Sequence, residues 1–212
     1  MRTSGLIRAL AADAHSRTMR PGRALTLASI PSVAAAFGLV LAMLGLRPHL
    51  ISLLGDPRIA FKLGLTILLA GLSARMVLLL ASPAANVRGV GRSLAIIPAL
   101  LAAAVFAELI AVPEDLWVRR AIGSNAAFCL ISIPFLAAVP LAATLLAMRQ
   151  GAPENPSLAG AAAGLFAGAI GAAFYATHCT DDSPLFVAVW YSLAIGFVVA
   201  AGALAGRRIL RW

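Results

Sequence analysis

The chain has 212 residues and a formal net charge of +9, and 61% of its residues are hydrophobic while only 12% are charged. Its mean hydropathy of +0.95 excludes a water-soluble globular protein. In a soluble protein this positive charge would suggest nucleic acid binding. Here the basic residues gather in the two tails and in the short segments between apolar runs, so we expect a lipid bilayer as partner and no direct nucleic acid binding.

The N-terminal segment 1–23 is the longest stretch outside the apolar runs. Its apolar and small side chains fall at helical spacing on one face at Leu6, Ile7, Leu10, Ala11 and Ala14. Asp13 lies away from this face. We therefore predict a short amphipathic helix, for which two interpretations stay open. It either lies on anionic lipid or places its apolar face in a groove of a soluble cytoplasmic partner.

Six apolar runs follow, each 20 to 23 residues long and nearly free of charge. They are Ala24–Leu46, Ile59–Ala81, Ser93–Val112, Ala126–Ala147, Ser157–Ala176 and Pro184–Ala205. About 20 helical residues cross a hydrocarbon core roughly 30 Å thick. A helix also satisfies its own backbone N–H and C=O groups there. The sequence thus predicts an all-α polytopic membrane protein, with a six-helix transmembrane bundle over residues 24–205 and a basic tail over 206–212.

The distribution of charge orients these six helices. An even number of crossings puts both termini on one side of the membrane. That side carries eleven basic residues against two acids, whereas the opposite side carries four basic residues against five acids. The positive-inside rule therefore predicts that both termini are cytoplasmic. We expect no cleaved signal peptide, because the first apolar run begins late and is too long for one.

The fifth run has a pattern of small residues at Gly160, Gly164, Gly168 and Gly171. Spacings of three or four residues put these glycines on one helix face, where a neighbouring backbone can approach closely. We expect this face to pack against other helices inside the bundle. A homodimer face is the alternative.

Three charged residues lie inside the runs: Lys62, Arg75 and Glu108. Charges at membrane depth are unfavourable unless they are paired or turned inward. The second and third runs form an antiparallel hairpin, so Lys62 and Glu108 lie near the same end and a contact between them is feasible. An ion or proton pathway is the alternative, but such a relay needs more than one acid.

Both cysteines lie at the outer end of the predicted bundle. Cys129 is in the first turn of the fourth run, and Cys179 follows the fifth run, next to His178. In an oxidising compartment the two thiols would form a disulfide if their Cα atoms approach within about 7 Å. With His178 they would instead suit a soft metal ion, or they are small apolar packing residues. The sequence has no CxxC motif, which argues against a thiol–disulfide oxidoreductase.

Several segments resemble the NrsF-type family of bacterial membrane proteins. They are Ser4–Ala14 (SGLIRALAADA), Gly123–Ile133 (GSNAAFCLISI), Ala147–Gly151 (AMRQG), Tyr175–Tyr191 (YATHCTDDSPLFVAVWY) and Gly206–Trp212 (GRRILRW). The resemblance covers essentially the whole chain, and both cysteine positions agree with it. Its most specific part is the HCxxDSP element with the aromatic pair that follows.

The resemblance implies a six-span protein of the bacterial inner membrane that negatively regulates the extracytoplasmic-function sigma factor sigma F and is not an enzyme. It implies that the sigma factor is held by a helix in the N-terminal segment, through Leu6, Ile7, Leu10, Asp13 and Ala14. It further implies that Cys129 and Cys179, beside His178, sense an envelope redox or metal signal. The cofactor expectation is none, apart from a regulatory heavy-metal ion bound by these three residues.

Two functions from other classes remain as alternatives. A small metal or solute transporter would need a polar path through the bundle, yet every acid except Glu108 lies outside the apolar runs. A membrane thiol–disulfide oxidoreductase is the other, and the missing CxxC motif disfavours it.

Overall fold

The computed structural model describes residues 3, 5, 21–82 and 86–211, and every regular element in this part of the chain is helical. Six helices are long and apolar enough to cross a membrane: Gly22–Met43, Pro57–Leu80, Arg88–Ala111, Glu114–Met148, Pro156–Ala176 and Pro184–Ile209. The predicted all-α class and all six predicted spans are therefore confirmed. The amphipathic helix predicted in the N-terminal segment lies outside the described residues.

The elements follow one another with short connections. In chain order they are α2 (Pro21–Met43), α3 (Leu50–Leu53), α4 (Pro57–Leu80), α5 (Arg88–Leu94), α6 (Ile96–Ala111), the 3₁₀ turn η1 (Glu114–Leu116), α7 (Trp117–Ile122), α8 (Ala126–Met148), α9 (Pro156–Ala176), α10 (Pro184–Phe186), the π-helical turn η2 (Val187–Tyr191) and α11 (Ser192–Ile209).

Local sequence explains where several helices begin and end. The first helix ends at Met43 instead of the predicted Leu46, because Gly45 takes a left-handed conformation with φ +74°. At the start of α4 the Asp56 carboxylate accepts a hydrogen bond from the Arg58 backbone N–H at 2.8 Å. Asn155 caps α9 in the same way.

The last span is longer than its predicted form. It continues as helix to Ile209, through four residues that the sequence suggested belong to a C-terminal tail. Arg207 and Arg208 lie in its final turn, where cations interact favourably with the helix dipole. Near its start it contains the π-helical turn η2, a rare widening of the helix that commonly occurs at functional sites.

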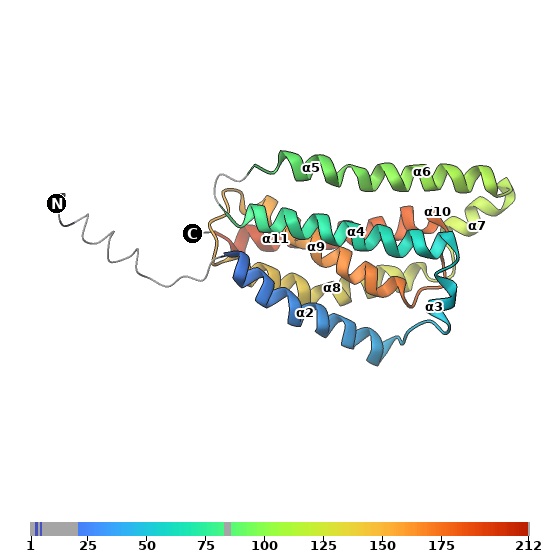
Figure 1. Ribbon diagram of the computed structural model, residues 1–212, viewed down its shortest axis with the longest axis horizontal. Helices are drawn as coiled ribbons and strands as arrows, with labels where there is room; N and C mark the ends of the chain where they lie inside the picture. Colours follow the sequence, from blue (N-terminus) through green and yellow to red (C-terminus); the bar gives the residue numbers. More distant parts are fainter. Residues whose placement is uncertain (1–2, 4, 6–20, 83–85, 212) are drawn as a thin grey trace.

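Helix α9 lies at the centre of the bundle and is the most buried of the six spans. It packs against α11, α8 and α4, while α2 packs mainly on α8. Arg88–Ala111, formed by α5 and α6, is the least buried span and runs along one side of the bundle (Figure 1). The molecule is therefore a five-helix core with a sixth helix that touches it mostly through α4 and α10.

The glycines of α9 permit this central position. A Cβ atom added to Gly160 would lie 2.8 Å from the Cα atom of Gly206 in α11, which is closer than packed atoms allow. A Cβ atom on Gly171 would lie 2.6 Å from the carbonyl oxygen of Ile133 in α8. The predicted use of this face for packing inside the bundle is confirmed.

The two ends of the bundle differ in content. Helix α2 begins and α11 ends at the same end, the left end in Figure 1, which we call the terminal end. The opposite end, which we call the far end, carries α3, α7, α10 and the segment 177–183. Both cysteines lie at the far end, because Cys129 is in the first turn of α8, just after α7, and Cys179 is in segment 177–183.

Candidate functional site

The segment 177–183, which joins α9 to α10, is fixed to α4 by one buried cation. The Lys62 side chain is 0% exposed. Its ammonium donates to the carbonyl oxygens of Cys179 at 2.9 Å and Asp181 at 3.2 Å, and it forms an ion pair with Asp182 at 2.5 Å. An ammonium has three N–H donors, and here each has an acceptor. Helix α4 thereby determines where Cys179 lies.

The connection after α2 holds the same segment from another side. Arg47 forms an ion pair with Asp182 at 2.7 Å, and its backbone N–H donates to the Thr177 carbonyl at 3.0 Å. The Nδ1 atom of His178 lies 3.1 Å from the Gly45 carbonyl oxygen. The segment that carries Cys179 is thus bonded to both α4 and the α2–α3 connection.

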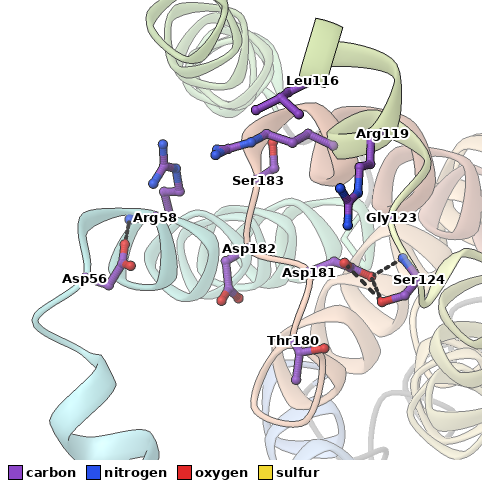
Figure 2. A pocket seen from close by; sticks show the side chains of 11 residues that line it. Asp56, Arg58, Leu116, Arg119, Gly123, Ser124, Thr180, Asp181, Asp182 and Ser183 are labelled. Atoms are coloured by element: carbon purple, nitrogen blue, oxygen red, sulfur yellow. Dashed lines mark hydrogen bonds between the residues drawn. The ribbon is translucent and has the colours of Figure 1, made fainter. Parts of the chain in front are cut away.

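A third attachment joins this segment to the start of α8. The Asp181 carboxylate accepts a hydrogen bond from the backbone N–H group of Ser124 at 3.0 Å (Figure 2). It accepts another from the backbone N–H group of Asn125 at 2.8 Å. Gly123 permits this approach, because a Cβ atom there would lie 2.8 Å from the Asp181 carboxylate carbon. These bonds fix the connection that leads into Cys129.

The two thiols lie in one apolar cluster under these bonds. Cys129 of α8 is 0% exposed and Cys179 is 1% exposed, and both are free. Neighbouring members of the cluster include Ile133, Phe186 and Val187. The structure therefore brings together the two predicted sensing cysteines, which are 50 positions apart in the chain.

Two tyrosine hydroxyls complete the cluster. Tyr175 of α9 and Tyr191 of the π-helical turn are buried beside Cys179, with ring centroids 6.0 Å apart. Neither hydroxyl makes a hydrogen bond of good geometry to any described residue. Buried polar groups are usually hydrogen-bonded, and the exceptions tend to have a functional explanation. The cluster thus places two phenol hydroxyls beside two thiols, of which that of Cys179 donates to the Asp181 carbonyl oxygen at 3.8 Å.

Burial raises the pKa of the Cys179 thiol above its ordinary value, although the nearby positive charge of Lys62 opposes this effect. The thiol is therefore protonated at neutral pH. The thiolate is the form that attacks oxidants and binds metal ions. Reaction at Cys179 accordingly requires proton loss and access to a site that is closed in this conformation.

The predicted metal ligands do not form one assembled set. Among the residues described, no three side chains of His, Cys, Asp or Glu lie close enough together to hold a metal ion. His178 contacts the Gly45 carbonyl, and its ring centroid lies 6.3 Å from that of Tyr175. Metal binding by Cys129, Cys179 and His178 stays a prediction that would require these side chains to rearrange.

Glu108 and Lys62 do not contact each other as their positions in adjacent spans had suggested. Glu108 accepts from Arg58 at 2.9 Å and from Arg120 of α7 at 2.6 Å, and Lys62 binds Asp182. The reason is that Arg58 lies one turn before Lys62 on α4 and reaches Glu108 first, while segment 177–183 covers Lys62. This pairing leaves both charges satisfied without a relay of acids between them.

Comparisons with known proteins identify the family. The family model described as "Negative regulator of sigma F" (NrsF) matches residues 10–212, which is most of the chain. The chain belongs to the NrsF family. No solved structure matches the chain at a significant level.

Two curated relatives share the NrsF name. A protein of Caulobacter vibrioides (strain NA1000 / CB15N) named "Anti-sigma-F factor NrsF" is 36% identical over 214 residues, and the match covers 100% of both chains. A protein of Azospira oryzae (strain ATCC BAA-33 / DSM 13638 / PS) named "Probable anti-sigma-F factor NrsF" is 42% identical over 84 residues, which is 40% of this chain and 39% of that protein. The resemblance seen in the sequence segments is therefore confirmed.

The second group of predicted site residues cannot be placed in this NrsF protein. Leu6, Ile7, Leu10, Asp13 and Ala14 lie outside the described residues. Their assignment as a sigma-binding face stays a prediction. The matched family region begins at Leu10, so it includes Leu10, Asp13 and Ala14 of that face.

Sequence reasoning missed two residues of the thiol cluster, Tyr175 and Tyr191, and it gave the wrong partner for the neighbouring Lys62. Lys62 had a clear signal, because it is a charge within an apolar run, but the sequence suggested the wrong partner for it. Tyr175 and Tyr191 stand at the two ends of the most specific family segment, which was the only hint. Nothing in the sequence signals that the turn ending at Tyr191 is π-helical.

Proposed function

We propose that this NrsF protein is a membrane-bound anti-sigma factor that holds an extracytoplasmic-function sigma factor at the cytoplasmic face of the bacterial inner membrane. The observation that carries this proposal is the family match over residues 10–212, together with a relative of the same length named as an anti-sigma-F factor. The six apolar helices supply the membrane anchor. The positive-inside distribution supports cytoplasmic termini.

In this proposal the N-terminal segment 1–23 binds the sigma factor. Its apolar face at Leu6, Ile7, Leu10 and Ala14 enters a groove on the partner, and Asp13 pairs with a basic residue there. The segment is too short for an independent folded domain, so a single helix must make most of the contact. Basic residues at the terminal end, among them Arg92 and Arg149, lie on the same side of the bundle and would add contacts with acidic patches.

Release is proposed to begin at the far end, at Cys129 and Cys179. Their burial in one cluster supports a sensor that is protected at rest and reacts when an oxidant or a soft metal ion reaches it. The three attachments of segment 177–183 hold the cluster closed. A disulfide, formed as the two thiols lose two protons and give two electrons to the oxidant, would move α8 and the end of α9 relative to each other. Coordination of one metal ion by the two deprotonated thiols would do the same.

The packing of α9 offers a route by which this movement would reach the terminal end. Its glycines contact α8 near Ile133 and α11 near Gly202 without intervening side chains. Helices in such close backbone contact cannot absorb a displacement by moving side chains. A helix shift of roughly 1–2 Å would therefore be transmitted along α9 to the terminal end. Each tenfold loss in affinity for the sigma factor needs only about 1.4 kcal/mol.

The first test addresses the binding segment. The full chain, purified from its native membrane, is expected to bring with it a soluble protein that mass spectrometry identifies as a sigma factor, and deletion of residues 1–20 should abolish this. Leu10→Glu should weaken binding to the purified sigma factor at least tenfold, because it puts a charge on the apolar face. Ala12→Glu is the matched control, since the predicted helix would place Ala12 opposite the apolar face and its variant should bind normally. Retention of the sigma factor by the deleted chain would reject this role of the segment.

The second test addresses release. A Cys129→Ser, Cys179→Ser double variant should hold the sigma factor as the parent does but fail to release it under oxidant or heavy-metal stress, as measured by a sigma-dependent reporter. The single variants help to separate disulfide formation from metal binding, because a disulfide needs both thiols. Normal induction in the double variant, at equal protein level in the membrane, would remove the cysteines from the mechanism while leaving the anti-sigma role intact.

A further inference from the structure

A second feature of the far end is a pocket of about 600 Å³ that opens to the outside. Its walls come from the start of α4, from α7 and from segment 177–183. In Figure 2, Arg58 stands on one side and Arg119 on the other, and Ser183 lies between them. Arg120 also lines it. Three guanidinium groups from two separate elements therefore surround one space.

The carboxylates near this pocket are occupied by groups of the chain itself. Both oxygens of Glu108 accept from guanidinium groups, one from Arg58 and one from Arg120, and Ser183 donates to it at 3.3 Å. Asp56 accepts from the backbone at the start of α4. These bonds occupy both oxygens of Glu108 and one oxygen of Asp56.

The two aspartates of segment 177–183 are occupied in the same way. Asp181 and Asp182 point to opposite sides of the segment (Figure 2). Asp181 accepts from two backbone N–H groups and from the side-chain amide of Asn125 at 2.8 Å. Asp182 is shared by Lys62 and Arg47. The acidic residues around the pocket therefore serve to fix its walls.

The guanidinium groups, by contrast, have donors to spare. A guanidinium carries five N–H donors in a planar fork. Arg58 and Arg120 each give one of them to Glu108. The Arg119 side chain has no hydrogen bond or ion pair with any residue that the structure describes, and it reaches into the pocket (Figure 2). The pocket thus combines unused guanidinium donors with carboxylates that are mostly bonded by the chain itself.

We propose that this pocket binds a phosphate group. A phosphate presents several acceptor oxygens in different directions, which matches guanidinium groups that approach from two elements. A single carboxylate would satisfy fewer of these donors. The proposal does not depend on sigma factor binding.

The phosphate comes either from a lipid headgroup or from free phosphate in solution. Helix α7 exposes Val118 and Ile122, at 67% and 54% of their surfaces, which suits a short helix lying at the membrane interface. Arg119 and Arg120 on the same helix would then lie at headgroup depth. The pocket is also open to water, so free phosphate reaches the same groups.

The experiment measures binding to the full-length protein purified in phosphate-free detergent, by isothermal titration calorimetry at constant ionic strength. Three probes are used: sodium phosphate, dihexanoyl phosphatidylglycerol below its micelle concentration, and dihexanoylglycerol as the lipid that lacks phosphate. At least one phosphate-bearing probe should bind and dihexanoylglycerol should not. Arg119→Gln should weaken that binding at least fivefold, and Arg119→Lys, which keeps the charge but loses the fork, should weaken it less.

Arg92→Gln is the matched control, since Arg92 is an exposed arginine of α5 at the terminal end, and it should leave binding unchanged. The Arg119 side chain has no bonded partner among the described residues, so its loss should not unfold the protein, and the thermal midpoint without ligand checks this. Binding of phosphate alone assigns the site to free phosphate, and binding of the lipid alone assigns it to a headgroup. Absence of binding by both probes, or equal binding by the Arg119→Gln variant, would overturn the proposal.

Discussion

Lys62 shows how one residue controls the position of another that is far away in the sequence. An ammonium group inside a membrane protein is costly unless each of its donors is bonded. Here two donors go to backbone carbonyls of segment 177–183 and the third goes to Asp182. An arginine would not fit this role, because the N–H donors of its guanidinium group lie in one plane. The three donors of an ammonium point in three directions from a single nitrogen, toward three separate acceptors. The position of Cys179 beside Cys129 therefore depends on a lysine 117 residues earlier in the chain.

We expect Lys62→Met to lower the free energy of unfolding by about 3 kcal/mol, the lower end for loss of one partner of a buried ion pair, because Asp182 keeps Arg47. Unfolding in mixed detergent micelles measures this. A double-mutant cycle with Asp182→Ala should give a coupling energy of at least about 1 kcal/mol. Arg47→Met, which removes the more exposed partner of the same aspartate, is the control and should cost less. Equal losses for the Lys62 and Arg47 variants would show that Lys62 is not the main anchor.

At the scale of elements, the central position of α9 depends on the absence of side chains. Gly160 and Gly164 allow α9 to lie directly against Gly202 and Gly206 of α11. Without a hydrophobic driving force between helices in lipid, close backbone packing is a main source of association. The span formed by α5 and α6 has no comparable contact and is the least buried. The bundle thus has a tight centre and a loosely attached edge.

Two glycines on the same helix test this interpretation. A Cβ atom on Gly202 would lie 2.9 Å from the Cα atom of Gly164, whereas a Cβ atom on Gly196 would meet nothing within 4 Å. We expect Gly202→Ala to destabilise the protein by about 1–3 kcal/mol through overpacking. Gly196→Ala should be neutral or slightly stabilising, because alanine favours a helix over glycine. Thermal unfolding in detergent compares the two, and similar midpoints would contradict the packing of α9 on α11.

For the whole molecule, the two ends of the bundle have different tasks in the proposed function. The far end holds the thiol cluster and the arginine-lined pocket, and the terminal end is where α2 begins and α11 ends. The proposal needs the far end to face the cell envelope and the terminal end to face the cytoplasm. An anti-sigma factor with the opposite orientation would have no access to its partner.

Matched cysteine variants test this orientation. In a chain with Cys129→Ser and Cys179→Ser, a new cysteine is placed by Ser52→Cys in α3 at the far end or by Ser82→Cys just after α4 at the terminal end; both serines are exposed. A membrane-impermeant maleimide should label the Ser52→Cys variant in intact cells. It should label the Ser82→Cys variant only after permeabilisation. The reverse pattern would refute the orientation and, with it, the proposed direction of signalling.

The sequence by itself determined the fold class and the number of spans, because runs of about 20 apolar residues have few other stable states in a bilayer. It also determined that the glycines of α9 face other helices, because spacings of three and four residues define one side of a helix. Both signals, the length of an apolar run and the spacing of glycines, lie within a single helix. They can therefore be interpreted without knowing which helix packs against it.

Only the tertiary structure decided which charges pair and what surrounds the thiols. Lys62 and Glu108 lie near the same end of adjacent spans, so the sequence allowed a contact between them. In the packed bundle Arg58 pairs with Glu108 instead, and Asp182 of segment 177–183 pairs with Lys62. The burial of Tyr175 and Tyr191 beside Cys179 depends on a π-helical turn and on the meeting of α8, α9 and α11. Contacts of this kind join residues far apart in the chain, and their geometry is set by the packing of whole helices, which no short stretch of sequence specifies.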